Sequence, residues 1–123
     1  MALTVGLAFA SLGAHGATAA ELVMVEEHGC AWCAKWNREI APIYPRTEEG
    51  RAAPLTRMDI SEARSADTFA RPVVFTPTFV LVHEGQELGR IEGYPGEDFF
   101  WGLLTRLIEA ELPPDATNQD LVN

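Results

Sequence analysis

The hydrophobic pattern of the first third of the chain predicts a buried strand followed by a helix. Residues 21–26 (ELVMVE) form a short apolar run rich in β-branched residues, which is typical of a buried strand. Residues 31–44 then carry apolar side chains at helical spacing, namely Trp32, Trp36, Ile40 and Ile43. Pro42 and Pro45 mark a kink and then the end of this helix, because proline cannot continue a helical hydrogen-bond pattern. We therefore expect Cys30 to lie at the N-terminus of the helix.

The middle of the chain predicts a second strand between two shorter segments. Residues 47–54 (TEEGRAAP) are turn-like, and residues 55–60 (LTRMDI) follow as a strand. Ser61 is a favourable N-cap residue for a short helix over residues 61–69, since its hydroxyl can accept a hydrogen bond from a free N–H of the first turn. The strand, helix, strand order up to residue 60 favours two parallel strands joined by a crossover.

The last third of the chain predicts a hairpin and a final helix. Residues 78–83 and 87–92 are predicted strands, joined by a turn at residues 84–86 (EGQ). Residues 97–112 follow as an amphipathic helix that the next two residues, both prolines, stop. The predicted apolar side of this helix comprises Phe99, Phe100, Leu103, Leu104, Leu107 and Ile108. Residues 113–123 are expected to form a polar C-terminal tail.

These elements predict an α/β fold with a four-stranded mixed sheet and helices on both of its faces. The crossover supplies a parallel pair of strands, and the hairpin adds antiparallel ones. The chain has 123 residues, of which 47% are hydrophobic and 22% charged, which is ordinary for one globular domain. We place that domain at residues 21–112.

Residues 1–20 have the composition of a secretory signal. No charged residue precedes Glu21, and Ala17-Thr18-Ala19 offers the small residues that a signal peptidase recognises, so we expect cleavage after Ala19 or Ala20. The signal is atypical, because no Lys or Arg precedes the apolar run. A retained transmembrane anchor is the alternative, but a spanning helix needs roughly 20 strongly apolar residues. Four residues interrupt this run, namely Ser11, Gly13, His15 and Gly16. Export would place the protein in an oxidising compartment such as the periplasm.

The charge of the chain argues against two classes of partner. The formal net charge is −9, and it is carried wholly from Glu21 onward. Nucleic acids and anionic membranes would repel such a surface. We therefore expect neither as a partner.

Cys30 and Cys33 are the only cysteines of the chain, and their CxxC spacing has several interpretations. A purely structural disulfide across so short a loop would stabilise the fold little, because the entropic gain grows with loop length. A structural zinc site needs about four ligands, and His28 and His83 are the other candidates in the mature chain. A soft-metal site built from both cysteines and a histidine such as His28 remains the alternative class, that of a metallochaperone.

A redox-active dithiol is the interpretation that the position of the motif favours. A thiolate at a helix N-terminus faces unpaired N–H groups and the positive end of the helix dipole, which lower its pKa. Cys30 is therefore the predicted nucleophile. Cys33, one helical turn later, is placed to attack the resulting mixed disulfide and release the product.

A second segment makes the chain resemble a known superfamily. Residues 75–80 (FTPTFV) are similar to the TPT segment that opens a core strand in thioredoxin-fold proteins. The resemblance implies that the Thr76-Pro77 bond is cis and faces Cys30, and that Gly93 lets a partner backbone approach. From the residues alone, a strand-start proline in trans and a plain turn glycine stay open for these two positions.

The resemblance covers residues 21–112 and narrows further. With one strand before the CxxC motif, the architecture resembles the trimmed, glutaredoxin-like form of the thioredoxin fold. Residues 29–60 are also similar to small periplasmic thioredoxin-like proteins of bacterial sulfur-oxidation (Sox) systems. That family implies a reductant, which receives electrons from a membrane thiol-disulfide transporter and reduces disulfides on periplasmic sulfur-oxidation proteins. We expect a monomer that requires no dissociable cofactor. Oxidases, isomerases and reductases share this geometry, so the direction of electron flow rests on the resemblance alone.

The chain departs from the thioredoxin pattern at three positions. Met24 stands where thioredoxins bury an Asp that accepts a proton from the resolving cysteine. Glu26 lies two residues along the same strand, hence on the same face, and could take that role, although a strand-end glutamate is often just solvated. Gly29 replaces the usual Trp before the first cysteine. Trp32 lies between the cysteines, where we expect it on the partner-facing rim, with ordinary packing against Trp36 or Tyr44 as the alternative.

Overall fold

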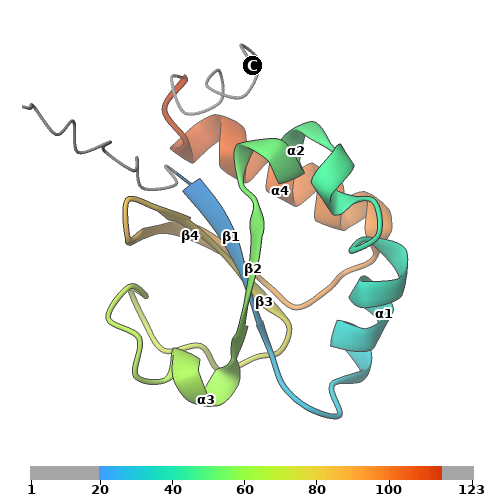
Figure 1. Ribbon diagram of the computed structural model, residues 1–123, viewed down its shortest axis with the longest axis vertical. Helices are drawn as coiled ribbons and strands as arrows, with labels where there is room; N and C mark the ends of the chain where they lie inside the picture. The colour runs from blue at the N-terminus through green and yellow to red at the C-terminus, as the bar shows by residue number, and fades with distance from the viewer. Residues whose placement is uncertain (1–19, 115–123) are drawn as a thin grey trace, which may run out of the picture.

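A four-stranded mixed sheet forms the centre of the computed structural model, which describes residues 20–114 (Figure 1). In spatial order its strands are β2 (Leu55–Asp59), β1 (Ala20–Glu26), β3 (Thr78–His83) and β4 (Gln86–Glu92). β1 and β2 are parallel, whereas β1 with β3 and β3 with β4 are antiparallel. The predicted mixed sheet and its strand order along the chain are confirmed.

Helices cover both faces of the sheet, as predicted. They are α1 (Ala31–Glu39), the 3₁₀ turn η1 (Tyr44–Arg46), α2 (Glu48–Ala52), α3 (Ile60–Ala63) and α4 (Glu97–Glu111). In Figure 1, α1, α2 and α4 lie on one side of the sheet and α3 on the other. Among residues 20–114, no helix is both long and apolar enough to span a membrane.

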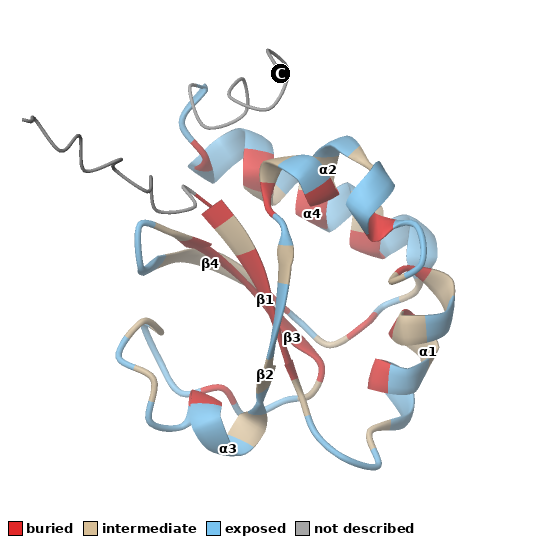
Figure 2. Cartoon of the chain, in the orientation of Figure 1, coloured by how far each residue is buried: buried red, intermediate tan, exposed pale blue. Residues whose placement is uncertain are grey.

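The alternation of side chains along β1 builds a separate core on each face. Leu22 and Met24 belong to the larger cluster under α1 and α4, which also holds Trp36 of α1 and Phe100 of α4. Val23 and Val25 belong to the smaller cluster under α3, with Ala63, Val73, Val80 and Val82. Figure 2 shows the buried residues running along β1 and β3. Since β1 and β3 are central strands, they are covered on both faces.

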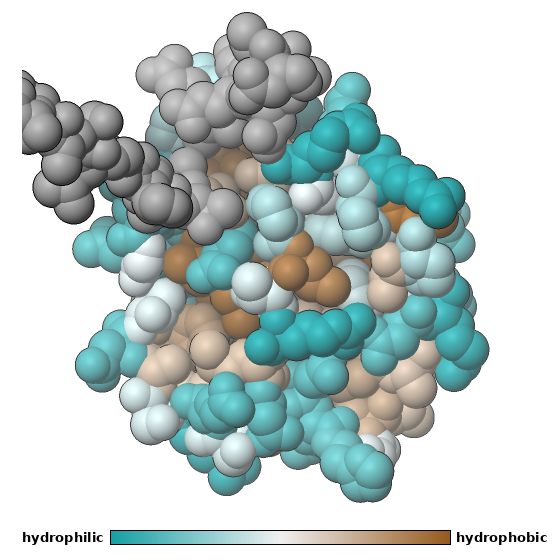
Figure 3. Space-filling model, in the orientation of Figure 1, coloured by the Kyte–Doolittle hydropathy of each residue, from teal (hydrophilic) through white to brown (hydrophobic). Residues whose placement is uncertain are grey.

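The surface near the edge strand β2 is mixed in character. No residue of β2 is fully buried: Leu55 and Met58 are half-buried and the other three residues are exposed, as expected for an edge strand with one partner. Figure 3 shows hydrophilic side chains over most of this face, with apolar side chains visible between them.

Helix α1 is shorter than predicted. It ends at Glu39 rather than near residue 44, because Pro42 has no N–H to donate and restricts the residue before it. The chain then turns tightly, with the N–H of Tyr44 bonded to the carbonyl of Ile40 at 2.9 Å. Pro45 lies within η1 instead of ending a helix.

The predicted turn over residues 47–54 contains the helix α2. Thr47 caps it by accepting a hydrogen bond from the N–H of Gly50 at 3.0 Å. Two glutamates in its first turn interact favourably with the positive end of the helix dipole. Gly50 within this helix is required for packing. A Cβ at this position would lie 1.8 Å from the carbonyl oxygen of Tyr44.

The second short helix also differs from the prediction. β2 ends at Asp59, and α3 covers only Ile60–Ala63 instead of residues 61–69. Its N-cap is Asp59, whose carboxylate accepts the N–H of Ser61 at 2.8 Å, so the capping residue lies two positions earlier than predicted.

The hairpin and α4 largely follow the prediction, with two corrections. The hairpin loop is only Glu84-Gly85, both with positive φ, and Gln86 already belongs to β4. α4 ends at Glu111, and its predicted apolar side is split. Phe100, Leu104 and Ile108 are buried, and Leu107 packs partly against them. Phe99 and Leu103 are 70% and 40% exposed.

The structure describes only a few residues of the predicted signal peptide and of the predicted C-terminal tail. The signal-peptide prediction lies outside the described residues except for Ala20, which is buried and pairs with His83. The predicted tail lies outside them from residue 115 onward.

Candidate active site

A short loop carries the chain from β1 to Cys30 at the start of α1. Gly29 in this loop has a φ of 80°, a left-handed conformation that glycine adopts readily and a Trp rarely does. A Trp at this position would therefore be strained in the observed backbone conformation. Cys30 is the N-cap of α1, and its sulfur accepts a hydrogen bond from the N–H of Cys33 at 3.1 Å.

The two cysteines form a disulfide and differ in exposure. Their Cα atoms are 5.2 Å apart, within the usual range for a disulfide. Cys30 is half-buried, whereas Cys33 is only 4% exposed and belongs to the main core. The first turn of α1 (AWCA) carries no acidic side chain that would oppose a thiolate. An incoming partner therefore meets the sulfur of Cys30 first.

A cleft of about 670 Å³ lies beside this disulfide. Its walls come from the end of β1, the following loop, α1 and the end of β2. The lining residues are Glu26, Glu27, His28, Gly29, Cys30, Ala31, Cys33, Ala34, Asn37, Arg57, Met58 and Asp59. Among the predicted site residues, Glu26 thus shares the cleft with both cysteines. The cleft is not lined by the other four, which all lie in the described part of the chain: Trp32, Thr76, Pro77 and Gly93.

Arg57 organises this cleft, and sequence reasoning missed it. Its guanidinium donates to Glu26 Oε2 at 2.5 Å and to Asn37 Oδ1 at 2.9 Å, and it lies 5.9 Å from the ring centroid of Trp36. Parallel pairing places Arg57 directly opposite Met24. The available signal was therefore the register of the two predicted parallel strands.

At position 24, an apolar core residue, Met24, replaces the buried Asp of the thioredoxin pattern. Met24 is fully buried, and its sulfur lies 3.6 Å from Nη1 of Arg57. The carboxylate that Arg57 contacts at this end of β1 is that of Glu26.

The segment around Pro77 is tied to the loop that precedes Cys30. The Thr76–Pro77 peptide bond is cis. The hydroxyl of Thr76 donates to Glu27 Oε1 at 3.0 Å, and the N–H of Gly93 donates to the carbonyl of Pro77 at 2.7 Å. Gly93 has a φ of 85°, which again favours glycine. Three predicted groove residues thus meet at one end of the sheet, and Glu27 is a contact that the sequence did not reveal.

Trp32 lies on the surface next to the disulfide. It is 56% exposed, whereas Trp36 and Tyr44 are fully buried. The Lys35 ammonium lies 5.4 Å from its ring centroid, within the range of a cation–π contact. Most of the indole is therefore free to contact a partner.

The described residues give no support to a metal centre. Within residues 20–114, no group of three or more His, Cys, Asp or Glu side chains is arranged to hold a metal ion.

Comparison with solved structures identifies the family. The crystal structure of the periplasmic thioredoxin SoxS from Paracoccus pantotrophus, in its reduced form, is 55% identical in sequence with a TM-score of 0.69. The match covers 73% of this chain and 96% of that one. The chain belongs to the thioredoxin superfamily, among its SoxS-like members. With its CxxC disulfide, this SoxS-like thioredoxin is a thiol–disulfide oxidoreductase.

More distant thioredoxins share the fold of this SoxS-like protein. The thioredoxin Mala s 13 of Malassezia sympodialis is 18% identical with a TM-score of 0.53, over 74% of this chain and 76% of that one. The thioredoxin of Fasciola hepatica is 21% identical with a TM-score of 0.54, over 71% and 79%. A search of family models and of curated proteins finds no match.

Proposed function

We propose that this SoxS-like thioredoxin is a periplasmic reductant of protein disulfides, with Cys30 as the nucleophile and Cys33 as the resolving thiol. The observation that carries the proposal is the contrast between the two sulfurs. Cys30 is half-buried at the N-terminus of α1, and Cys33 is buried behind it. The 55% sequence identity between this protein and a periplasmic thioredoxin supports a periplasmic location.

The proposed reaction transfers two electrons in two exchange steps. The thiolate of reduced Cys30 attacks one sulfur of the partner disulfide, which forms a mixed disulfide and releases the first partner thiolate. Cys33 then loses its proton, and its sulfur attacks Cys30. The Cys30–Cys33 disulfide forms, the second partner thiolate leaves, and both partner thiolates take up protons from solvent. The hydrogen bond from the N–H of Cys33 to the Cys30 sulfur supports this assignment, because it favours the thiolate of Cys30.

Glu26 is the proposed acceptor of the Cys33 proton. It lines the same cleft as Cys33, and its ion pair with Arg57 fixes the position of the carboxylate. Arg57 in turn is held by Asn37 of α1. A water in the cleft could link the carboxylate to the thiol, as general-base catalysis allows.

Trp32, Thr76, Pro77 and Gly93 are the proposed groove for the partner chain. The exposure of Trp32 and the hydrogen bonds that join Thr76 to Glu27 and Pro77 to Gly93 support this assignment. Main-chain groups of the partner would contact this groove while its disulfide meets Cys30.

The proposed partners follow from the family. As a SoxS-like protein it would reduce disulfides on periplasmic sulfur-oxidation proteins, receive electrons from a membrane thiol-disulfide transporter, and act as a monomer without a dissociable cofactor. Export requires removal of the signal peptide, residues 1–20. Because Ala20 is buried and paired in β1, cleavage after Ala19 would preserve the whole strand, and the mass of the mature protein tests this site.

Reduction of insulin disulfides tests the proposed function. With dithiothreitol as electron source, the wild-type protein should accelerate insulin reduction, and Cys30→Ser should reduce the rate to that without protein. Metal analysis of the same purified sample addresses the metal-binding alternative. A stoichiometric soft metal together with no turnover would contradict the proposal.

A further inference from the structure

A partly buried ion pair on the edge strand β4 lies outside the chemistry described above. The side chains of Arg90 and Glu87 are only 4% and 7% exposed. The guanidinium donates from Nε to Glu87 Oε2 at 2.9 Å and from Nη2 to Glu87 Oε1 at 2.5 Å. This two-pronged contact is the geometry in which an arginine–carboxylate pair is strongest. A charged pair so well shielded on an edge strand calls for a specific role.

A β-bulge brings the two side chains to the same face of the sheet. Residues three apart on a regular strand point to opposite faces. In β4 the register shifts, so that Gly89 pairs with Leu81 and Glu87 with Val82, and Leu88 is the extra residue. Arg90 pairs with Val80, and both valines belong to the cluster under α3. The bulge therefore places Glu87 and Arg90 beside each other on that face.

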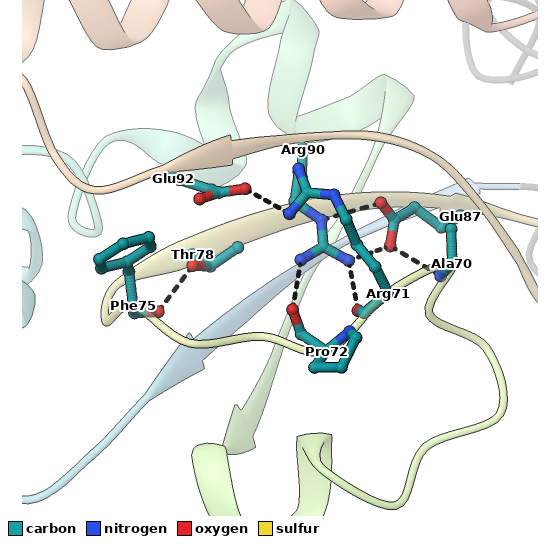
Figure 4. A network of polar contacts seen from close by, with 8 residues as sticks. All are labelled: Ala70, Arg71, Pro72, Phe75, Thr78, Glu87, Arg90 and Glu92. Atoms are coloured by element: carbon teal, nitrogen blue, oxygen red, sulfur yellow. Dashed lines mark hydrogen bonds and ion pairs between the residues drawn. The ribbon is translucent and has the colours of Figure 1, made fainter.

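The pair holds the start of the loop that leads to Pro77 (Figure 4). Arg90 donates to the carbonyl of Arg71 at 2.9 Å and to that of Pro72 at 3.3 Å. Glu87 accepts the N–H of Ala70 at 3.1 Å. All three loop residues are thus fixed through their main chains, so the contact does not depend on their side chains.

Further contacts fix the rest of the loop. The side chain of Arg71 pairs with Glu92 at 2.6 Å, and the hydroxyl of Thr78 donates to the carbonyl of Phe75 at 2.6 Å. Val73 is buried. Between these anchors, Val74 and Phe75 are 66% and 57% exposed and directly precede Thr76. The loop therefore presents two apolar side chains on a main chain that β4 holds in place.

We propose that Arg90, held by Glu87, is a positioning residue that fixes the segment Val74–Pro77 for contact with partner proteins. The inference rests on the proposed reduction of protein disulfides. The hydrogen bonds of Arg90 go to Glu87, Arg71 and Pro72 and not to either cysteine, so it would act through the loop and not on the sulfurs. A loop ordered before binding costs less entropy when the partner docks. Binding of a protein substrate should depend on Arg90, and chemistry on a small disulfide should not.

Steady-state kinetics of Arg90→Met test this division. The variant keeps much of the side-chain volume but loses the charge and all donors. We expect its KM for insulin to rise about fivefold to tenfold with kcat nearly unchanged. Its rate with the small disulfide 5,5′-dithiobis(2-nitrobenzoate), and its equilibrium with glutathione, should stay within about twofold of wild type. Arg106→Met is the matched control, because Arg106 is exposed on α4 and forms no ion pair with any described residue.

Two outcomes would overturn the inference. One is an unchanged KM for insulin in folded Arg90→Met, and the other is an equal loss of rate with insulin and with the small disulfide. If Arg90→Met does not fold, the Glu87→Gln variant tests the inference instead, since it keeps the shape of the side chain while removing its charge. Its KM for insulin should also rise, but by less than that expected for Arg90→Met. A wild-type protein that fails to reduce insulin would instead refute the proposed function.

Discussion

At the scale of single residues, the unequal exposure of two sulfurs separates their proposed roles. Cys30 is accessible and Cys33 is buried. Cys33→Ser should therefore leave the first exchange intact but remove the second, so that a partner stays bound through a mixed disulfide with Cys30. Non-reducing mass spectrometry after incubation with a disulfide-containing protein would show the adduct. Cys30→Ser is the control, and an adduct through Cys33 in that variant would contradict the assignment.

Glu26 provides a second prediction at this scale. Glu26→Gln removes the proposed proton acceptor but keeps the shape of the side chain. We expect the second exchange step to slow on the order of 100-fold near neutral pH, as loss of a general base does. Stopped-flow tryptophan fluorescence across a pH series would measure it, with Glu62→Gln on α3 as the control. An unchanged pH profile would remove Glu26 from the mechanism.

Sequence reasoning singled out both cysteines of the disulfide but not all of their neighbours. Cys30 at a helix start follows from the local pattern of strand and helix. Arg57 and Glu27 contact residues that are far away in the sequence. Arg57 donates hydrogen bonds to Glu26 and Asn37, and Glu27 accepts one from Thr76. Such contacts depend on how elements pack, which no local pattern contains.

At the scale of elements, one buried hydroxyl joins η1 to the segment before β2. The hydroxyl of Tyr44 donates to the carbonyl of Ala53 at 2.6 Å, and both residues are fully buried. Burial, together with the negative charge of Glu49, raises the pKa of Tyr44 and keeps the donor protonated. Tyr44→Phe should reduce the free energy of unfolding by about 1–3 kcal/mol, because the carbonyl loses its buried donor. Urea unfolding measures the change, and an unaltered midpoint would contradict it.

The ion pair on β4 makes part of the stability depend on pH. Burial raises the pKa of Glu87, but hydrogen bonds from Arg90 and Ala70 and the charges of Arg90 and Arg71 outweigh it and hold the pKa below its ordinary value. The stabilisation is therefore present above the unfolded-state pKa of about 4.3 and is lost as the pH falls through the lower folded-state value. Urea unfolding of wild type and Glu87→Gln between neutral and acidic pH tests this. The difference in stability between them should shrink in acid, and a constant difference would contradict the account.

The boundaries of elements were the part that sequence could not fix. The strands followed from apolar runs, but α2 was missed because residues 47–54 have the composition of a turn, and the glycine within it, Gly50, is required by a close contact with Tyr44. The bulge at Leu88 leaves no local signal either, because it arises from pairing with β3. In both cases tertiary contacts decide the local structure.

At the scale of the whole molecule, the sheet brings three distant segments to one end. β1 leads into Cys30, β3 begins just after Pro77, and β4 ends just before Gly93. The order of elements was enough to predict a mixed sheet with helices on both faces, because parallel crossovers and hairpins allow few arrangements. The thioredoxin-like form of that sheet was predicted from the resemblance of the CxxC and TPT segments. The same arrangement serves thioredoxins of very different sequence, such as the one from Fasciola hepatica at 21% identity. A shared fold does not determine the direction of electron flow, which has to be measured.

The equilibrium of the Cys30–Cys33 disulfide with glutathione tests the proposed reductant most directly. The fraction of reduced protein can be followed over a series of glutathione ratios at pH 7, with Cys33→Ser as a control that cannot close the disulfide. The account predicts a reduction potential near that of thioredoxin, about −270 mV. A value near about −120 mV, typical of a strong oxidant, would contradict it.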